Sequence, residues 1–137
     1  LGACLRSAAA FQASKVILLQ ESSSPFHPRA TRAASGQTLA TPIERGPSIR
    51  DLAKLMEDKR GQEGLQTLFA LDMAGEPLAE AALPESARLL LGEEGQGVPE
   101  ELRARKVRIP MARNVESLNA AAALSVALYA WKNAKRT

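Results

Sequence analysis

Short apolar runs and stretches of helical spacing alternate along the chain. The runs are rich in leucine and β-branched residues and are bounded by turn residues, so each predicts a buried strand. These strands are expected at residues 15–19, 65–71, 88–91 and 107–111, with a weaker candidate at 39–43. Helices are expected over residues 3–13, 29–35, 48–61 and 115–133. Strands that alternate with helices predict an α/β fold, with a mostly parallel sheet flanked by helices.

Capping, glycine and proline residues refine these boundaries. Ser48 and Asp51 form a Ser-x-x-Asp capping box, so Ser48 is expected to begin a helix that Gly61 ends. The stretch 72–86 predicts a turn and a short helix, and Pro99 is typical of a helix first turn. The last helix is apolar on nearly every side, which indicates a buried or interface helix.

Length and composition fit one globular domain. The chain has 137 residues, 45% of them apolar. The single cysteine, Cys4, suits a reducing compartment and so a cytoplasmic protein, and no apolar run approaches the roughly 20 residues of a membrane span. The first residue is Leu1 rather than Met, so we expect the chain to be part of a longer protein. Its alanine-rich start has the composition of a transit segment, but the strand that follows favours a place in the domain.

Charge is unevenly distributed along the chain. Residues 1–50 carry six basic and two acidic side chains, residues 51–101 four and twelve, and residues 102–137 eight and one. The two basic ends can form a face that attracts a polyanion, although an ordinary solvated surface would have the same composition.

A glycine-rich turn follows the strand at 88–91. Its sequence, GEEGQG, occupies residues 92–97. Glycine permits close approach of backbone to a ligand. Two glutamates would repel a phosphate, so the turn favours a neutral or cationic ligand, or is simply a strand–helix connection.

Three polar residues stand out on the apolar helices. Arg6 is the only charge in the alanine-rich helix, so it either reaches solvent or faces a cleft that binds an anion. Ser117 and Asn119 are expected in the first turn of the last helix. Asn114 or Ser117 can cap that helix, which leaves Asn119 without an explanation.

Together these segments resemble the three sequence motifs of the SpoU family, in the SPOUT superfamily of knotted methyltransferases. The motifs read roughly N-x-G-A-x-x-R-[ST]-A-x-A-F, G-x-E-G-x-G after a strand, and I-P-M followed by S-L-N. Their order and spacing agree over essentially the whole chain. The matching residues are Gly2, Ala3, Arg6, Ser7, Ala8, Ala10 and Phe11, then Gly92, Glu94, Gly95 and Gly97, then Ile109, Pro110, Met111, Ser117, Leu118 and Asn119.

The chain departs from this pattern in three places. The motif-one Asn would lie just before Leu1 and is absent from this sequence, which leaves the active site incomplete. Gln12 stands where glycine is usual, and the run at residues 120–123 replaces a more typical N-V-S/A sequence. We expect the last two to be packing variation.

The resemblance implies that residues 1–137 form a catalytic domain that methylates a ribose 2′-hydroxyl in ribosomal or transfer RNA. It implies S-adenosyl-L-methionine as the cofactor, a deep trefoil knot in the C-terminal third, and a homodimer through the final helix. The implied cofactor pocket contains Leu91, Gly92, Glu94, Gly95, Ile109, Met111, Ser117 and Leu118.

The implied catalytic residues are Arg6, Glu94, Ser117 and Asn119. A guanidinium is not normally deprotonated in proteins, so we expect Arg6 to grip an RNA phosphate and stabilise the developing alkoxide rather than to act as a base. Arg29 and Arg32 are further candidates for RNA contact.

Two other functions remain open. The chain can be an RNA-binding module of the same fold without catalysis, or, on the glycine turn alone, an unrelated nucleotide-binding enzyme. His27 is the sole histidine and is expected in a surface loop, so no metal site is expected. We expect Trp131 to pack in an interface rather than to stack on a base.

Overall fold

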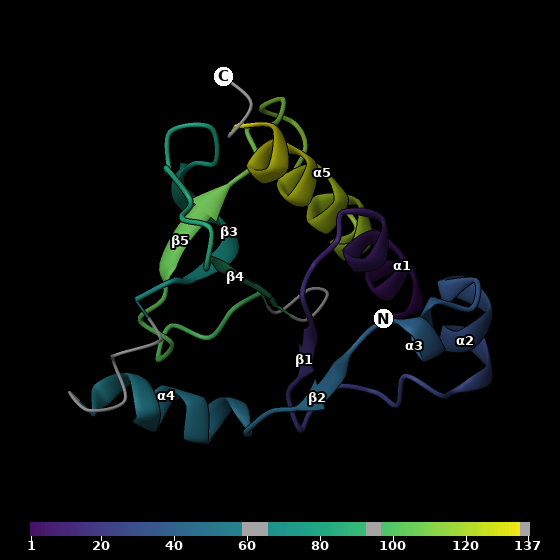
Figure 1. Ribbon diagram of the computed structural model, residues 1–137. Helices are drawn as coiled ribbons and strands as arrows, with labels where there is room; N and C mark the ends of the chain where they lie inside the picture. The colour runs from purple at the N-terminus through teal and green to yellow at the C-terminus, as the bar shows by residue number, and fades with distance from the viewer. Residues whose placement is uncertain (59–65, 93–96, 135–137) are drawn as a thin grey trace.

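The computed structural model describes residues 1–58, 66–92 and 97–134, which form the helices and strands labelled in Figure 1. In chain order, the elements of the first half are α1 (Gly2–Ala10), β1 (Val16–Leu18), α2 (Pro28–Ala34), α3 (Gln37–Ala40), β2 (Ile43–Arg45) and α4 (Ile49–Glu57). Those of the second half are β3 (Leu68–Pro77), β4 (Arg88–Leu91), β5 (Arg105–Arg108) and α5 (Ala120–Asn133).

Every strand pairing within the described residues is parallel. β1 pairs with β2, and a second sheet has the order β4-β3-β5. Parallel strands require crossover connections, which are supplied here by helices and loops. The predicted α/β class with parallel strands is confirmed, although the described strands form two small sheets.

Helices α2 and α4 begin at residues whose side chains cap them. His27 caps α2, because its Nδ1 accepts a hydrogen bond from the Arg29 backbone N–H at 3.3 Å. The predicted surface loop at His27 therefore ends in a helix cap. Ser48 caps α4 as predicted, accepting from the Asp51 N–H at 3.1 Å, but that helix ends at Glu57. Gly61, the predicted end, lies outside the described residues.

Two predicted element types are wrong because long-range pairing decides them. The strand expected at 39–43 is instead the short helix α3 followed by β2, whose pairing with β1 begins at Ile43. The turn and helix expected from residue 72 are wrong over 72–77, because β3 continues to Pro77. An irregularity between Leu71 and Glu76 lets both residues pair with Val107 of β5.

Gly75 makes this irregularity possible. It is buried, and a Cβ atom there would overlap the backbone of Lys106 and Val107. The glycine that suggested a turn in the sequence instead allows two backbones to lie in close contact.

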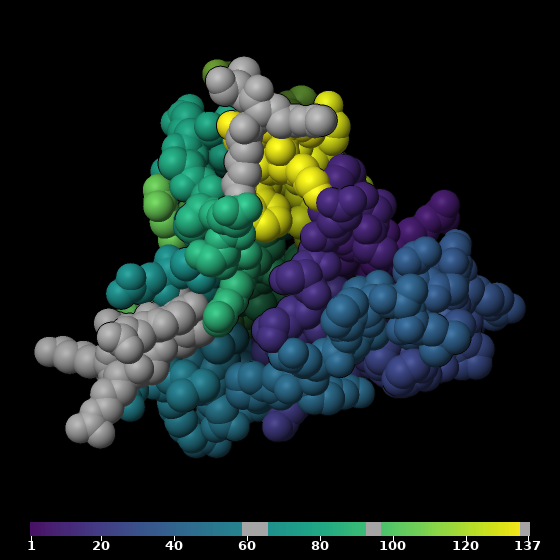
Figure 2. All heavy atoms as spheres, in the orientation of Figure 1, coloured from purple at the N-terminus to yellow at the C-terminus, as the bar shows by residue number. Residues whose placement is uncertain are grey.

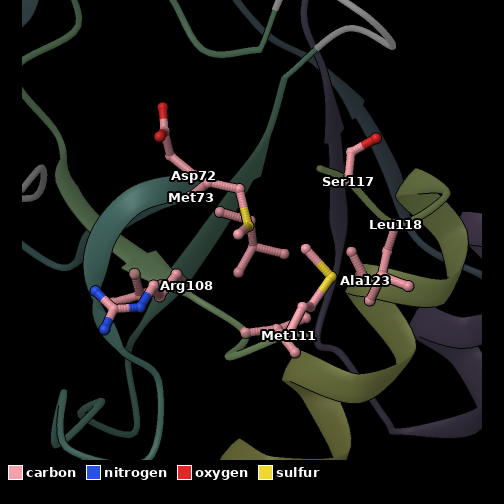
Figure 3. A pocket seen from close by; sticks show the side chains of 10 residues that line it. Asp72, Met73, Arg108, Met111, Ser117, Leu118 and Ala123 are labelled. Carbon is pink, nitrogen blue, oxygen red and sulfur yellow. The ribbon is translucent and has the colours of Figure 1, made fainter. Parts of the chain in front are cut away.

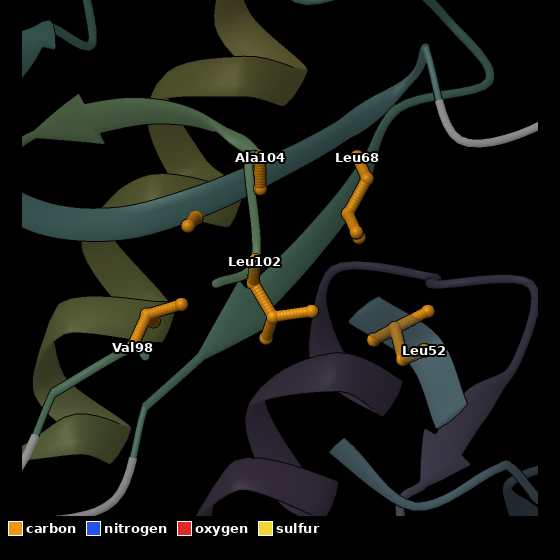
Figure 4. Close-up of a cluster of buried hydrophobic side chains, with 6 residues drawn as sticks. Leu52, Leu68, Val98, Leu102 and Ala104 are labelled. Atoms are coloured by element: carbon orange, nitrogen blue, oxygen red, sulfur yellow. The ribbon is translucent and has the colours of Figure 1, made fainter. Parts of the chain in front are cut away.

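The helix expected to begin at Pro99 is not formed. The chain turns instead, with the Leu102 N–H donating to the Pro99 carbonyl at 3.0 Å. The turn directs Val98 and Leu102 into an apolar cluster, where they meet Leu52 of α4 (Figure 4). The complete buried cluster is Leu52, Leu68, Ala70, Val98, Leu102 and Ala104. A second cluster lies on the other face of β3, around Phe69, Leu78, Ala81, Val107 and Ala127.

Helix α5 begins five residues later than predicted. Asn119 is its N-cap, and the Asn119 Oδ1 accepts a hydrogen bond from the Ala121 N–H at 3.0 Å. The prediction that Asn114 or Ser117 caps this helix is wrong. Capping explains the polar side chain at Asn119 that the sequence left without a role.

The first and last helices lie side by side (Figure 1). The Ser7 and Ser125 hydroxyls are 2.7 Å apart across the α1–α5 contact, and the rings of Phe11 and Tyr129 meet edge to face. Lys132 donates to the Phe11 carbonyl at 3.1 Å and to the Gln12 side-chain oxygen at 2.7 Å. These contacts fix the end of α1 against α5.

The backbone conformation at Gln12 explains why the SpoU motif usually has glycine at this position. Its φ is +57°, in the left-handed region that favours glycine, so the family's usual glycine suits this position. The expectation that Gln12 is packing variation is therefore corrected. The Lys132 hydrogen bond partly offsets the strain that a side chain causes here.

Replacing Gln12 tests this explanation. Gln12→Gly and Gln12→Ala both remove the amide that Lys132 contacts, but only Gln12→Gly relieves the backbone strain. We expect the free energy of unfolding of Gln12→Gly to exceed that of Gln12→Ala by about 1 kcal/mol. Urea denaturation of both variants measures the difference, and equal stabilities would contradict the strain.

Candidate functional site

A pocket opens where the irregular part of β3, from residue 71 onward, and the carboxyl end of β5 meet the start of α5. Its polar and charged lining residues are Asp72, Arg108 and Ser117. Its apolar lining residues are Leu71, Met73, Val107, Ile109, Met111, Leu118 and Ala123. In Figure 3, Met73 and Met111 come from opposite sides of this pocket, with Leu118 and Ala123 beside Met111. Carboxyl ends of parallel strands are a usual place for ligands in α/β folds.

Asp72 is the carboxylate of the pocket. Its Oδ1 accepts a hydrogen bond from the Ala74 N–H at 2.9 Å, and its Oδ2 lies 3.2 Å from the Lys106 ammonium. The backbone hydrogen bond, followed by the one from Lys106, lowers the pKa of Asp72 below its usual 3.8. Asp72 is therefore charged at neutral pH. The stability that it contributes is present above pH 3.8 and is lost only as the pH falls through the lowered value.

Arg108 is the cation of the pocket. Its Nη1 donates to the Gly75 carbonyl at 2.6 Å, so the guanidinium is held against the irregular part of β3. Lys106 beside it contacts both Asp72 and Glu100, at 3.2 and 3.1 Å, and the Glu100 contact is the larger cause of a raised Lys106 pKa. Among the described residues, Lys106 thus contacts two carboxylates, and Arg108 donates one N–H to a carbonyl oxygen.

Four of the predicted cofactor residues come together in this pocket. Ile109 and Met111 follow β5, while Ser117 and Leu118 lie just before α5. Leu91 and Gly92 are not among its lining residues, and Glu94 and Gly95 lie outside the described residues. The roles of these residues in cofactor binding stay predictions.

Gly92 nevertheless occupies a tight position. A Cβ atom at Gly92 would overlap the backbone of Gly97, so the two ends of the glycine turn are held together. Gly97 itself has a φ of +72° and open space around it. The first glycine permits a close approach and the last permits a left-handed turn.

The sequence motifs did not identify the pocket residues that belong to β3. Leu71, Asp72 and Met73 all line the pocket. The predicted strand ended at Leu71, and residues at carboxyl ends of neighbouring parallel strands meet at one edge. Applied to the predicted strand, this rule could have identified Asp72 and Met73 as candidate site residues.

Arg6 is exposed on α1 and is not among the residues that line the pocket. Solvent access explains how the alanine-rich helix accommodates the charge. Asn119 is the cap of α5, while Ser117 faces the pocket two residues earlier. Within this chain the structure therefore brings Ser117, but not Arg6, to the pocket, and the catalytic roles of both stay predictions.

Two further predicted residues are exposed on α2. Arg29 and Arg32 carry no salt bridge to any residue that the structure describes. Trp131 is half-buried, and its indole N–H donates to the Pro84 carbonyl at 3.1 Å.

Within residues 1–58, 66–92 and 97–134 there is no group of three or more His, Cys, Asp or Glu side chains arranged to hold a metal ion. Over the same residues, no helix is long and apolar enough to cross a membrane.

Comparison with known proteins identifies the family. The sequence model of the SpoU rRNA Methylase family matches residues 1–129. The chain belongs to this family. Its pocket is thus built by segments of the third SpoU motif together with the middle of β3 and the end of β5.

Several curated RNA methyltransferases resemble the chain along most of its length. It is 40% identical over 131 residues to "Ribosomal RNA small subunit methyltransferase G 2" of Syntrophobacter fumaroxidans, covering 96% of this chain and 24% of that protein. It is 33% identical over 132 residues to the 23S rRNA (guanosine-2′-O-)-methyltransferase RlmB of Pseudomonas syringae pv. tomato, covering 94% and 51%. The chain thus spans from a quarter to half of these curated relatives.

A solved relative has a similar backbone. The SpoU methyltransferase AviRb from Streptomyces viridochromogenes, in complex with the cofactor AdoMet, matches with a TM-score of 0.82 at 27% identity. The match covers 98% of this chain and 55% of AviRb.

Proposed function

We propose that this chain is the catalytic domain of an enzyme that methylates a ribose 2′-hydroxyl in ribosomal or transfer RNA. S-adenosylmethionine is the proposed methyl donor. The observation that carries the proposal is the pocket, which gathers Ile109, Met111, Ser117 and Leu118 from the third SpoU motif. The names of the relatives support the reaction, since RlmB is a guanosine-2′-O-methyltransferase and AviRb was solved with AdoMet.

The lining of the pocket fits this cofactor. Leu71, Met111 and Leu118 offer apolar walls for an adenine ring. Asp72 offers a carboxylate that stays ionised at neutral pH, which suits the hydroxyls or the positive charge of the cofactor.

The chemistry divides between cofactor and protein. The bound cofactor supplies a methyl group on a good leaving group. The residues of the chain align that group with the ribose oxygen, which is worth several orders of magnitude in rate when the geometry is correct. Ser117 at the pocket is a hydrogen-bond donor or acceptor for cofactor or ribose, and Asn119 fixes its segment by capping α5.

Arg6 is proposed to serve the acceptor side of the reaction. It binds an RNA phosphate and stabilises negative charge on the ribose oxygen as the proton leaves. Its exposure on α1 is compatible with binding a large polyanion. Glu94 is proposed to position the cofactor or the ribose.

The knot, the assembly and the location are further parts of the proposal. Family membership supports a deep trefoil knot in the C-terminal third and a homodimer through α5. Val126 and Tyr129 of α5 are 43% and 60% exposed, which leaves apolar surface for a second copy. We propose a cytoplasmic location because the RNA substrates are found there.

Binding and transfer experiments test this function together. We expect isothermal titration to give micromolar affinity for S-adenosylmethionine and no comparable affinity for ATP. With labelled cofactor and ribosomal or transfer RNA, we expect 2′-O-methylnucleosides in the digested product. Cofactor binding without transfer would indicate an RNA-binding module that lacks catalysis, and base-methylated products or ATP binding would refute the proposal.

A further inference from the structure

Phe26 is an exposed aromatic side chain on a well-defined turn. It is 65% exposed, although most phenylalanines in a domain of this size are buried. The turn runs from Ser24 to His27, with the His27 N–H donating to the Ser24 carbonyl at 3.2 Å. The Ser24 hydroxyl also accepts from the Phe26 N–H at 3.2 Å. The phenyl ring is therefore presented to solvent by a backbone whose hydrogen bonds are made.

The neighbours of Phe26 restrict the turn further. Pro25 precedes it, is buried, and occupies the second turn position, where the fixed φ of proline is favoured. His27 and Pro28 follow and begin α2. The exposed ring contributes little to the core and is held by the turn, so it is preorganised for contact with a partner.

Basic residues follow Phe26 closely in the chain. Arg29 and Arg32 follow on α2, three residues apart and hence on one face of that helix. Residues 22–43 contain no acidic side chain. The nearest preceding acid, Glu21, accepts a hydrogen bond from the Ile49 N–H at 3.0 Å and so serves the start of α4. We call Phe26, Arg29 and Arg32 the α2 surface.

The α2 surface is joined rigidly to the helix that carries Arg6. Gly2 of α1 is buried against Ala30 and Ala33 of α2, where a Cβ atom would overlap the Ala30 carbonyl. Figure 2 shows the same association, with the purple and blue N-terminal residues packed as one lobe beside the green and yellow part of the molecule. The α2 surface and Arg6 therefore belong to one unit.

We propose that the α2 surface binds a single-stranded segment of the RNA substrate, with Phe26 stacked on an unpaired base and Arg29 and Arg32 on its phosphates. This inference rests on the proposed function and names part of its substrate contact. Aromatic stacking and cationic backbone contacts are the usual combination for single-stranded nucleic acid. The α2 surface combines both on a rigid support.

The test compares Phe26→Ala with Phe26→Trp and with a matched control. Leu39→Ala removes an apolar side chain from the neighbouring α3 that is 84% exposed. With a fluorescein-labelled single-stranded RNA of mixed sequence, Phe26→Ala should weaken binding by about 5- to 100-fold. Phe26→Trp should retain affinity, and Leu39→Ala should change it by less than about twofold.

A probe without bases separates stacking from charge. Phe26→Ala should leave the affinity for heparin unchanged, whereas Arg29→Gln and Arg32→Gln should weaken binding of both heparin and RNA. Each arginine variant should also lower the slope of log affinity against log salt for the RNA by about 0.7.

Three results would overturn the proposal. One is equal loss of RNA affinity in Phe26→Ala and Leu39→Ala, and another is equal loss of RNA and heparin affinity in Phe26→Ala. The third is a change in oligomeric mass on Phe26→Ala with unchanged RNA affinity, which would make the α2 surface a protein interface. Titration with S-adenosylmethionine reports on the proposed function separately, since each variant should retain cofactor affinity.

Discussion

Replacing Arg6 by alanine is expected to lower methyl transfer by at least about a hundredfold while changing cofactor affinity by less than about twofold. The loss of transfer follows from the proposed acceptor-side role of Arg6. The unchanged cofactor affinity follows from its exposure on α1 and its absence from the lining of the pocket. A side chain that contacts only the acceptor affects the transition state and RNA, not the cofactor. Single-turnover transfer assays and isothermal titration on the same preparation measure the two effects.

The control is Arg50→Ala, which removes an exposed arginine from α4. It should change transfer little, because surface substitutions away from a site have small effects. A large loss of cofactor affinity in Arg6→Ala, with unchanged thermal unfolding, would place Arg6 in the cofactor pocket and contradict its assignment to the acceptor.

Replacing Gly92 by alanine is expected to have the second large effect. The added Cβ would overlap the backbone of Gly97, so the glycine turn must move. We expect cofactor affinity to fall by more than tenfold and the free energy of unfolding by about 2–3 kcal/mol. Isothermal titration and urea denaturation measure these changes.

Gly97→Ala is the matched control at the other end of the turn. It meets open space but must adopt a φ of +72°, which costs about 1 kcal/mol. The expected order of damage is thus Gly92→Ala above Gly97→Ala. The reverse order, or unchanged cofactor affinity in Gly92→Ala, would remove the ends of this turn from cofactor binding.

Local signals in the sequence predicted the elements that depend on local physics. The strand Val16–Leu18, the helix Pro28–Ala34 and the cap at Ser48 all lie where apolar runs and capping residues put them. The extension of β3 to Pro77 was not predictable in this way. The sequence of the extension predicts a turn. Its residues are extended because they pair with β5, which follows about 30 residues later in the chain.

The candidate site was also predicted only in part, because sequence motifs do not show which strands become neighbours. Motif resemblance found Ile109, Met111, Ser117 and Leu118, which line one pocket. Asp72 carries no motif, and its importance appears only when β3 and β5 are neighbours. Asn119, by contrast, belongs to a motif. The structure shows that it also caps α5, a role that helix spacing had assigned to Asn114 or Ser117.

The contact between α1 and α5 has a consequence for how the protein is made. Ser7 and Ser125 meet across 118 positions of the chain, and Lys132 meets Gln12 across 120. During translation α1 is synthesised before α5, and the helix that fixes its end leaves the ribosome more than a hundred residues later. Such distant contacts slow folding, and apolar surface that waits for its partner is prone to aggregation. The part of α1 that packs on α5 is thus left uncovered in the nascent chain until α5 has been synthesised.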